Sequence, residues 1–157
     1  MTRQIIRIEE SDPREPEIQA LITALDSYML NLYPAESTHR IDLEVLASRK
    51  ARFYSATLNT ELCGCGAIVL DDSDYAEVKR LYVSPRCRGQ GIAQAILQRL
   101  EQSALSLGID TLRLETGIHQ PEALALFTAF GFNRSERFGN YPADDPNSVF
   151  MEKCILA

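Results

Sequence analysis

The sequence predicts a mixed α/β domain built on one mostly antiparallel, twisted sheet of about six or seven strands, with about four helices distributed over both faces. Three observations predict this class. The 157 residues suit a single domain, residues 1–157. The first half of the chain contains strands separated by short turns, as in a meander. The second half alternates strand, helix, strand, helix and strand.

The apolar pattern of the first half predicts one long helix, one short helix and several strands. Apolar residues at Leu21, Leu25, Tyr28 and Leu32 predict an amphipathic helix over 16–32. The other elements of this half are, in order, a strand over 3–8, a short helix over 41–46, and strands over 53–58, 62–70 and 75–83, with turns at 59–60 and 71–74.

In the second half, glycine and proline residues indicate where helices begin and end. Gly108 predicts the end of a helix over 91–107, and Gly131 the end of a helix that Pro121 begins. The remaining elements are strands over 111–116, from 132 onward and over 148–156, with a loop over 138–147.

Composition and charge narrow the class of partner. The formal net charge of −6 disfavours nucleic acid, which requires a basic face. No segment approaches the ~18 apolar residues of a membrane span, and the N-terminus lacks a secretory pattern. We therefore expect a cytoplasmic protein without membrane contact. Four cysteines without a C-x-x-C pair, and only two histidines, predict reduced thiols and no metal.

A glycine loop between the strand over 75–83 and the following helix predicts a phosphate site. Free backbone N–H groups at the helix start, the positive end of the helix dipole and two arginines all favour an anion there. A P-loop would end in G-K-[ST], and a dinucleotide fingerprint would carry a third glycine where Gln94 stands. The form that fits is Q/R-x-x-G-x-G/A, met by residues 86–91, R-C-R-G-Q-G.

Two stretches resemble motifs of one family. Residues 77–107 resemble motif A of the GNAT superfamily of N-acetyltransferases, and residues 112–132, L-R-L-E-T-G-I-H-Q-P-E-A-L-A-L-F-T-A-F-G-F, resemble its motif B. Both stand in the family's order, and the resemblance covers almost the whole chain. It implies a GNAT-like fold whose central strands splay around coenzyme A. It also implies an acetyl-CoA-dependent N-acetyltransferase that modifies a primary amine of a small molecule or peptide by direct attack in a ternary complex. Dimers are common in the family.

The resemblance also assigns residues to the cofactor. Backbone groups of Leu81, Tyr82 and Val83 would hydrogen-bond the pantetheine arm. Backbone N–H groups of the loop would hold the pyrophosphate, and the loop residues are Arg86, Cys87, Arg88, Gly89, Gln90, Gly91, Ile92 and Ala93. Gln120 stands where the family commonly has an asparagine that contacts the cofactor. Phe127 stands where many members have a tyrosine that gives the leaving thiolate its proton.

Two carboxylates are candidates for the base. An ammonium with a pKa near 10 must lose its proton before it attacks, so a carboxylate must assist. Even spacing along the predicted strand puts Glu77, Lys79, Leu81 and Val83 on one face, pointing Glu77 toward the thioester. Glu115 ends the neighbouring strand. The sequence leaves the choice between Glu77 and Glu115 open.

The proton donor and the acceptor contacts come from less specific signals. Because phenylalanine cannot donate a proton, Phe127 leaves that role to Tyr141, to Tyr82, to water or to no group. Acceptor contacts are expected from two loops, and the residues are Tyr33, Glu36 and His39 from the first and Tyr141 from the second. The alternative function is a non-catalytic acyl-CoA-binding or sensor module of the same fold, which Phe127 favours and the two glutamates oppose.

Overall fold

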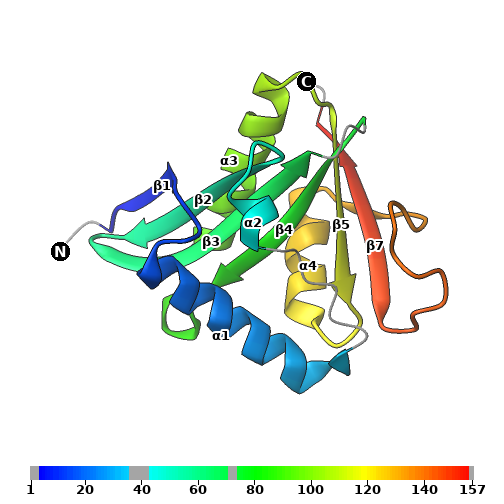
Figure 1. The fold of residues 1–157 in the computed structure, drawn as a ribbon, viewed down its shortest axis with the longest axis horizontal. Helices are drawn as coiled ribbons and strands as arrows, with labels where there is room; N and C mark the ends of the chain where they lie inside the picture. Colours follow the sequence, from blue (N-terminus) through cyan, green and yellow to red (C-terminus); the bar gives the residue numbers. More distant parts are fainter. Residues whose placement is uncertain (1–3, 36–42, 71–73, 156–157) are drawn as a thin grey trace.

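The computed structural model describes residues 4–35, 43–70 and 74–155. Within these ranges, seven strands form one sheet in the order β1-β2-β3-β4-β5-β7-β6, and four α-helices cover it (Figure 1). All neighbouring strands pair antiparallel except β4 and β5, which are parallel. The predicted mixed, mostly antiparallel class is confirmed. The strands are β1 (Ile6–Glu10), β2 (Ala51–Leu58), β3 (Glu61–Leu70), β4 (Ala76–Val83), β5 (Thr111–Gly117), β6 (Asn133–Arg134) and β7 (Ser148–Cys154). The helices are α1 (Pro16–Leu32), α2 (Leu43–Leu46), α3 (Ile92–Ser106) and α4 (Pro121–Phe130).

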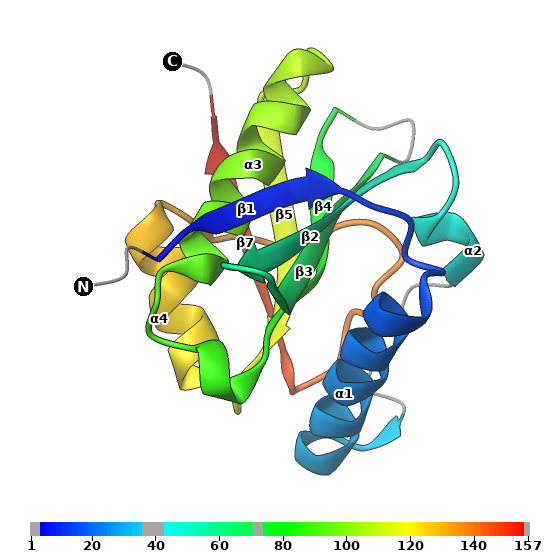
Figure 2. The same cartoon turned by 90° about the vertical axis from the view of Figure 1, so that its left-hand side faces the viewer.

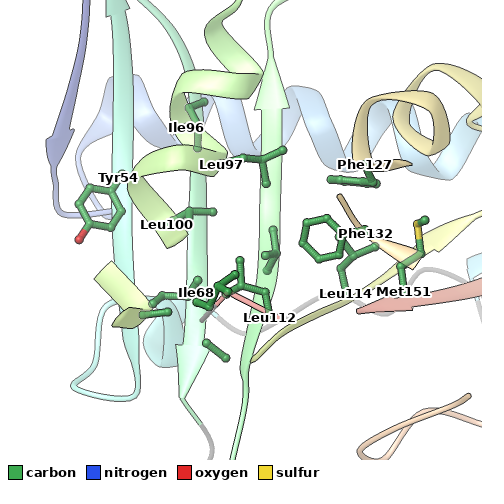
Figure 3. Close-up of a cluster of buried hydrophobic side chains, with 14 of the residues drawn as sticks. Tyr54, Ile68, Ile96, Leu97, Leu100, Leu112, Leu114, Phe127, Phe132 and Met151 are labelled. Carbon is green, nitrogen blue, oxygen red and sulfur yellow. The ribbon is translucent and has the colours of Figure 1, made fainter. Parts of the chain in front are cut away.

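The helices divide between the two faces of the sheet, as predicted. Figure 2 shows α3 and α4 on one face and α1 and α2 on the other. The larger core lies under α3 and α4, where Figure 3 shows Phe127 and Phe132 beside Leu114 and Met151. A smaller core lies under α1 and α2 and includes Ile18, Leu46 and Phe53. No helix in the described ranges combines the length and apolar character needed to cross a bilayer.

Most element boundaries agree with the sequence prediction, and the first strand is the main exception. Its described part continues to Glu10, beyond the predicted end at Ile8, because it pairs with β2 until Glu10 lies opposite Tyr54. The turn at 59–60 is confirmed. Asn59 adopts a φ of 59° there, a conformation that asparagine tolerates better than most residues. Parts of four predicted segments, at residues 3, 41–42, 71–73 and 156, lie outside the described residues.

A bulge in β4 overturns the predicted alternation along that strand. The pairing register between β3 and β4 shifts between Cys65 and Ala67, and Arg80 adopts a left-handed φ of 58°. One extra residue in a strand reverses which face the following side chains occupy. Lys79 lies opposite Ala67 of the smaller core, whereas Leu81 packs against the larger core under α3. The prediction that Glu77, Lys79, Leu81 and Val83 share a face is therefore wrong.

The parallel strands β4 and β5 separate soon after they begin to pair. Their registered pairs are Ala76 with Leu112 and Glu77 with Arg113. Beyond these pairs the strands diverge toward their carboxyl ends. The predicted separation of the two central strands is thus observed, and it opens the sheet next to the start of α3.

Candidate active site

A cleft of about 640 Å³ lies at the place where β4 and β5 separate. Its walls come from α1, the ends of β4 and β5, the glycine loop and the first turns of α3 and α4. Most of the residues predicted to contact the cofactor line it: Leu81, Tyr82, Val83, Cys87, Arg88, Gly89, Gly91, Ile92, Ala93, Gln120 and Phe127. Arg86 and Gln90 are not among the lining residues. Arg86 instead forms an ion pair with Glu61 at the surface.

The glycine loop presents a helix start that no described side chain caps. A 3₁₀ turn, η2 (Pro85–Cys87), leads into Gly89 and Gly91, whose φ values of 78° and 82° favour glycine. Gly91 is the N-cap of α3, and the first turn of this helix contains no acidic side chain. The first backbone N–H groups of a helix have no partner within the helix. Together with the helix dipole they form a site for an anion.

Arg88 connects the glycine loop to the other walls. Its Nε donates a hydrogen bond to the carbonyl oxygen of Val83 at 3.1 Å. Its guanidinium carbon lies 6.0 Å from the ring centroids of both Tyr28, on α1, and Tyr82, on β4. The sequence predicted Arg88 as a cation beside the phosphate site but did not place Tyr28 there, because it counted Tyr28 only among the apolar residues of the helix over 16–32.

Tyr33 and Gln120 form a structural clamp. The backbone N–H of His119 donates to the Tyr33 hydroxyl at 3.0 Å, and this hydroxyl donates to Oε1 of Gln120 at 3.3 Å. Tyr33 is 4% exposed, its ring stacks on His119, and it fills the space beside Gly117. Tyr33 was predicted to contact the acceptor, but the structure places it outside the lining of the cleft. Gln120 does line the cleft.

Glu115 reaches the cleft, and Glu77 does not. Glu115 lines the cleft, and its Oε2 accepts a hydrogen bond from Ser148 Oγ at 2.8 Å. Glu77 lies outside the lining residues. Its carboxylate accepts a hydrogen bond from the Tyr141 hydroxyl and lies 3.2 Å from Lys79 Nζ. The two glutamates between which the sequence left the choice open therefore occupy different environments.

Tyr141 lies in an aromatic cluster beside Glu77. Its ring centroid is 5.5 Å from that of Phe138 and 5.5 Å from that of Phe150. Burial, followed by the negative charge of Glu77, raises the pKa of Tyr141 well above its ordinary value, so the hydroxyl keeps its proton. Tyr141 is not among the residues that line the cleft. Its predicted roles as acid and acceptor contact therefore remain predictions without support from its position.

Phe127 keeps its place in the cleft lining but offers no proton. Its ring contacts Phe132 edge-on, with 5.7 Å between the centroids. Two other predicted acceptor residues, Glu36 and His39, lie outside the described residues. The sequence analysis missed Asp26 on α1, which lines the cleft and forms an ion pair with Arg80. These two residues are 54 positions apart, so no local pattern marks the pair.

Two buried thiols meet behind the glycine loop. The sulfur atoms of Cys63 and Cys87 are 2.8 Å apart, and the Glu61 carboxylate lies within 4.8 Å of both. Cys63 and Cys87 are far apart in the sequence, so no local pattern predicts that they lie together. Burial, together with the hydrogen bond to Cys87, raises the pKa of Cys63 to about 11, which favours the thiol over a metal-binding thiolate. The prediction that the protein uses no metal stays a prediction.

Comparison with known proteins identifies the family. Residues 18–132 match the model of the acetyltransferase (GNAT) family. An IAA acetyltransferase of Azospirillum brasilense is 42% identical over 149 residues, covering 94% of this chain and 97% of that protein. A crystal structure from Klebsiella pneumoniae, described as an acyl-CoA N-acyltransferase, has a TM-score of 0.82 and 36% identity, and covers 97% of this chain and 99% of that one.

A more distant structure has the same fold. The PaiA N-acetyltransferase of Thermoplasma acidophilum, solved in complex with coenzyme A, has a TM-score of 0.70 at 18% identity, with 96% of this chain and 99% of that one covered. The match of the family model over most of the chain, together with the near full-length relatives, settles the assignment. The chain belongs to the GNAT family of acetyltransferases.

Proposed function

We propose that the protein is an acetyl-CoA-dependent N-acetyltransferase that acetylates a primary amine of a small molecule or peptide by direct attack in a ternary complex. One observation carries the proposal. A single cleft joins the uncapped start of α3 to the carboxylate of Glu115 through the opening between β4 and β5. An anionic donor and a base for the acceptor are both required for this reaction, and the cleft brings the two sites together.

The donor end suits the diphosphate of coenzyme A. The backbone of residues 89–93 would hold the pyrophosphate, since the two glycines leave it uncovered: a Cβ on Gly89 or Gly91 would meet no described atom within 4 Å. Backbone groups of residues 81–83 would bind the pantetheine arm. Arg88 Nε occupies the Val83 carbonyl, so an arm that bonds this oxygen must displace that contact. The Thermoplasma relative of the same fold was solved with coenzyme A.

Glu115 is the proposed base. When bound, acetyl-CoA supplies an activated acyl group. Glu115, oriented by Ser148, would take the proton of the acceptor ammonium directly or through one water. The new bond joins the amine nitrogen to the acetyl carbon, the carbon–sulfur bond breaks, and the electron pair leaves on sulfur. Glu77 acts indirectly, because it contacts Lys79 and Tyr141.

The leaving group is proposed to depart as the thiolate, before any proton reaches the sulfur. Phe127 has no donor, and Tyr141 directs its hydroxyl to Glu77. A thiol with a pKa near ~8.5 is a competent leaving group as the thiolate. Proton transfer to sulfur would then follow from water or from Tyr82, which lines the cleft.

The test combines binding and turnover. Acetyl-CoA should raise the Tm, and thiol release across a panel of primary amines should give one acetylated amine for each CoA, as measured by mass spectrometry. Phe127 favours the second candidate, a non-catalytic acyl-CoA-binding module. Tight binding of acetyl-CoA without turnover on any amine or peptide would support that candidate and contradict the enzyme.

A further inference from the structure

The end of the cleft that adjoins α1 carries charged side chains of both signs. Asp26 comes from α1, Lys79 and Arg80 from β4, and Glu115 from β5. The side chains of Lys79 and Arg80 are only 17% and 10% exposed. Charges buried to this degree are costly to desolvate and add little to stability even when paired. Because both residues line the cleft, where a few placed polar groups orient a ligand, they are candidates for binding an anionic group.

The bulge in β4 is what brings both cations to this end. In a regular strand, consecutive side chains point to opposite faces. The extra residue at Arg80 breaks this alternation, so that Arg80 reaches Asp26 on α1 while Lys79 lies in the same layer, opposite Ala67. Arg80 holds a strained left-handed φ of 58° to do so. Strain of this kind is concentrated at functional sites.

Each cation is fixed in position by a carboxylate. Lys79 Nζ lies 3.2 Å from Glu77 and donates to the Tyr141 hydroxyl, and Arg80 is paired with Asp26. These contacts orient the ammonium, with its three donors, and the guanidinium, with its five. Because Lys79 and Arg80 both line the cleft, an anionic group at this end would lie beside two cations held in a preset arrangement.

Glu115 supplies the opposite charge in the same neighbourhood. Residues 77 and 113 are paired across β4 and β5, and Lys79 and Glu115, two positions further along each strand, both line the cleft that opens where the strands separate. The negative charge of Glu115 also acts on Tyr141, whose hydroxyl accepts a hydrogen bond from Lys79. Two carboxylates, Asp26 and Glu115, and two cations thus flank one space, and Asp26 is already paired with Arg80.

We infer that the acceptor is a small amine that also carries a carboxylate, as an amino acid does, with its amine at Glu115 and its carboxylate between Lys79 and Arg80. This inference rests on the proposed N-acetyl transfer and narrows its acceptor. A polyamine would place a second positive charge beside Lys79 and Arg80, where Glu77 and Asp26 are already paired with those cations. An amine whose remaining groups are apolar would exclude water from Lys79 and Arg80 without offering them a hydrogen-bond acceptor.

Matched acceptors test the inference. The panel contains each common α-amino acid, its methyl ester and the amine left when its carboxyl group is removed, and CoA release gives kcat/KM for each. For the side chains that fit, we expect the free amino acid to exceed both derivatives by roughly tenfold to a hundredfold, because each derivative loses a charge-assisted hydrogen bond.

The outcomes separate this inference from the proposed function. If the esters or decarboxylated amines react as well as the free acids, the carboxylate assignment is overturned while N-acetyl transfer stands. If a protein that binds acetyl-CoA releases no thiol with any amine, the proposed function is overturned and the inference with it.

Paired variants locate the preference. Lys79→Met should reduce the preference for the acid over its ester about tenfold, mainly through the KM of the acid, whereas Lys79→Arg should retain much of it. Lys153 provides the matched control. It lies 3.2 Å from Glu101 with 19% side-chain exposure, comparable to the Lys79–Glu77 pair, but outside the cleft lining. Lys153→Met should leave the preference unchanged. A Lys79→Met protein that keeps the full preference would overturn the assignment of the carboxylate site.

Discussion

The hydroxyl of Tyr141 donates a hydrogen bond to the carboxylate of Glu77, and this contact gives the two candidate bases different environments. Glu77 is held by Tyr141 and Lys79 outside the lining of the cleft. Glu115 lines the cleft and accepts a hydrogen bond from Ser148. A base must lie within hydrogen-bond reach of the proton that it removes. Position therefore favours Glu115.

Replacement of the two glutamates should give unequal losses. Glu115→Gln should lower kcat/KM for the amine by about 10²- to 10⁴-fold, because a glutamine cannot accept the proton. Glu77→Gln keeps a hydrogen-bond acceptor for Tyr141 and should cost about tenfold or less. Steady-state kinetics at fixed pH measures both. A larger loss in Glu77→Gln than in Glu115→Gln would show that the base is Glu77.

The sequence predicted the fold well because its evidence was local. The apolar spacing of α1, the glycines that end α3 and α4, and the motif order each report on neighbouring residues. The bulge at Arg80 escaped prediction, since it depends on the pairing of β4 with β3. That one residue changed the predicted face of Leu81 and with it the orientation expected for Glu77.

The site was predicted in part for the same reason. The glycine loop is continuous in sequence and was predicted. Asp26 lines the cleft from α1, and Ser148 donates a hydrogen bond to Glu115 from β7, so no local pattern indicates either residue. Nothing near Tyr33 in the sequence indicates that its ring fills the space beside Gly117. Polar residues in loops were the weakest indication of acceptor contacts, because simple exposure to solvent explains most polar loop residues as well as a role in binding does.

Glycines at the two ends of α3 allow a controlled test of the anion site. Gly91 and Gly108 have φ values of 82° and 78°, and a Cβ on either would meet no described atom within 4 Å. Alanine at either position should cost about 1–2 kcal/mol from the left-handed backbone. Calorimetry should show that Gly91→Ala also weakens acetyl-CoA binding while Gly108→Ala does not. Equal affinities in the two variants would argue against a pyrophosphate at the helix start.

The contact between Tyr33 and Gly117 predicts a strong stability coupling. A Cβ on Gly117 would lie 1.8 Å from the Tyr33 hydroxyl oxygen, so Gly117→Ala must displace the ring. We expect a loss of at least about 3 kcal/mol in the free energy of unfolding. Combined with Tyr33→Ala, the cost should be less than the sum by about 1 kcal/mol or more in urea titrations. Tyr33→Ala with Gly108→Ala serves as the additive control. Additive costs for Gly117→Ala and Tyr33→Ala would show that the Tyr33 ring does not fill the space beside Gly117.

Buried thiols predict a loss of stability at alkaline pH. Burial raises the pKa of Cys65 from 9.0 to about 12, and that of Cys63 rises to about 11. The unfolded chain therefore releases these protons before the folded chain does. This contribution to stability is complete below about pH 9 and is lost as the pH rises toward 11 and 12. Urea titrations across that interval should show a smaller decline for Cys65→Ala. An identical decline in the free energy of unfolding for both proteins would show that the pKa of Cys65 is not raised by folding.

Hydrogen exchange with and without acetyl-CoA would show whether the cleft between β4, α3 and α4 binds the donor. We expect slower exchange for backbone amides of residues 81–93 and of the first turn of α4 when acetyl-CoA is present. Residues of β1 and β2, remote from the cleft, should exchange unchanged. Binding of acetyl-CoA that protects other segments and leaves residues 81–93 unaffected would show that the donor binds elsewhere.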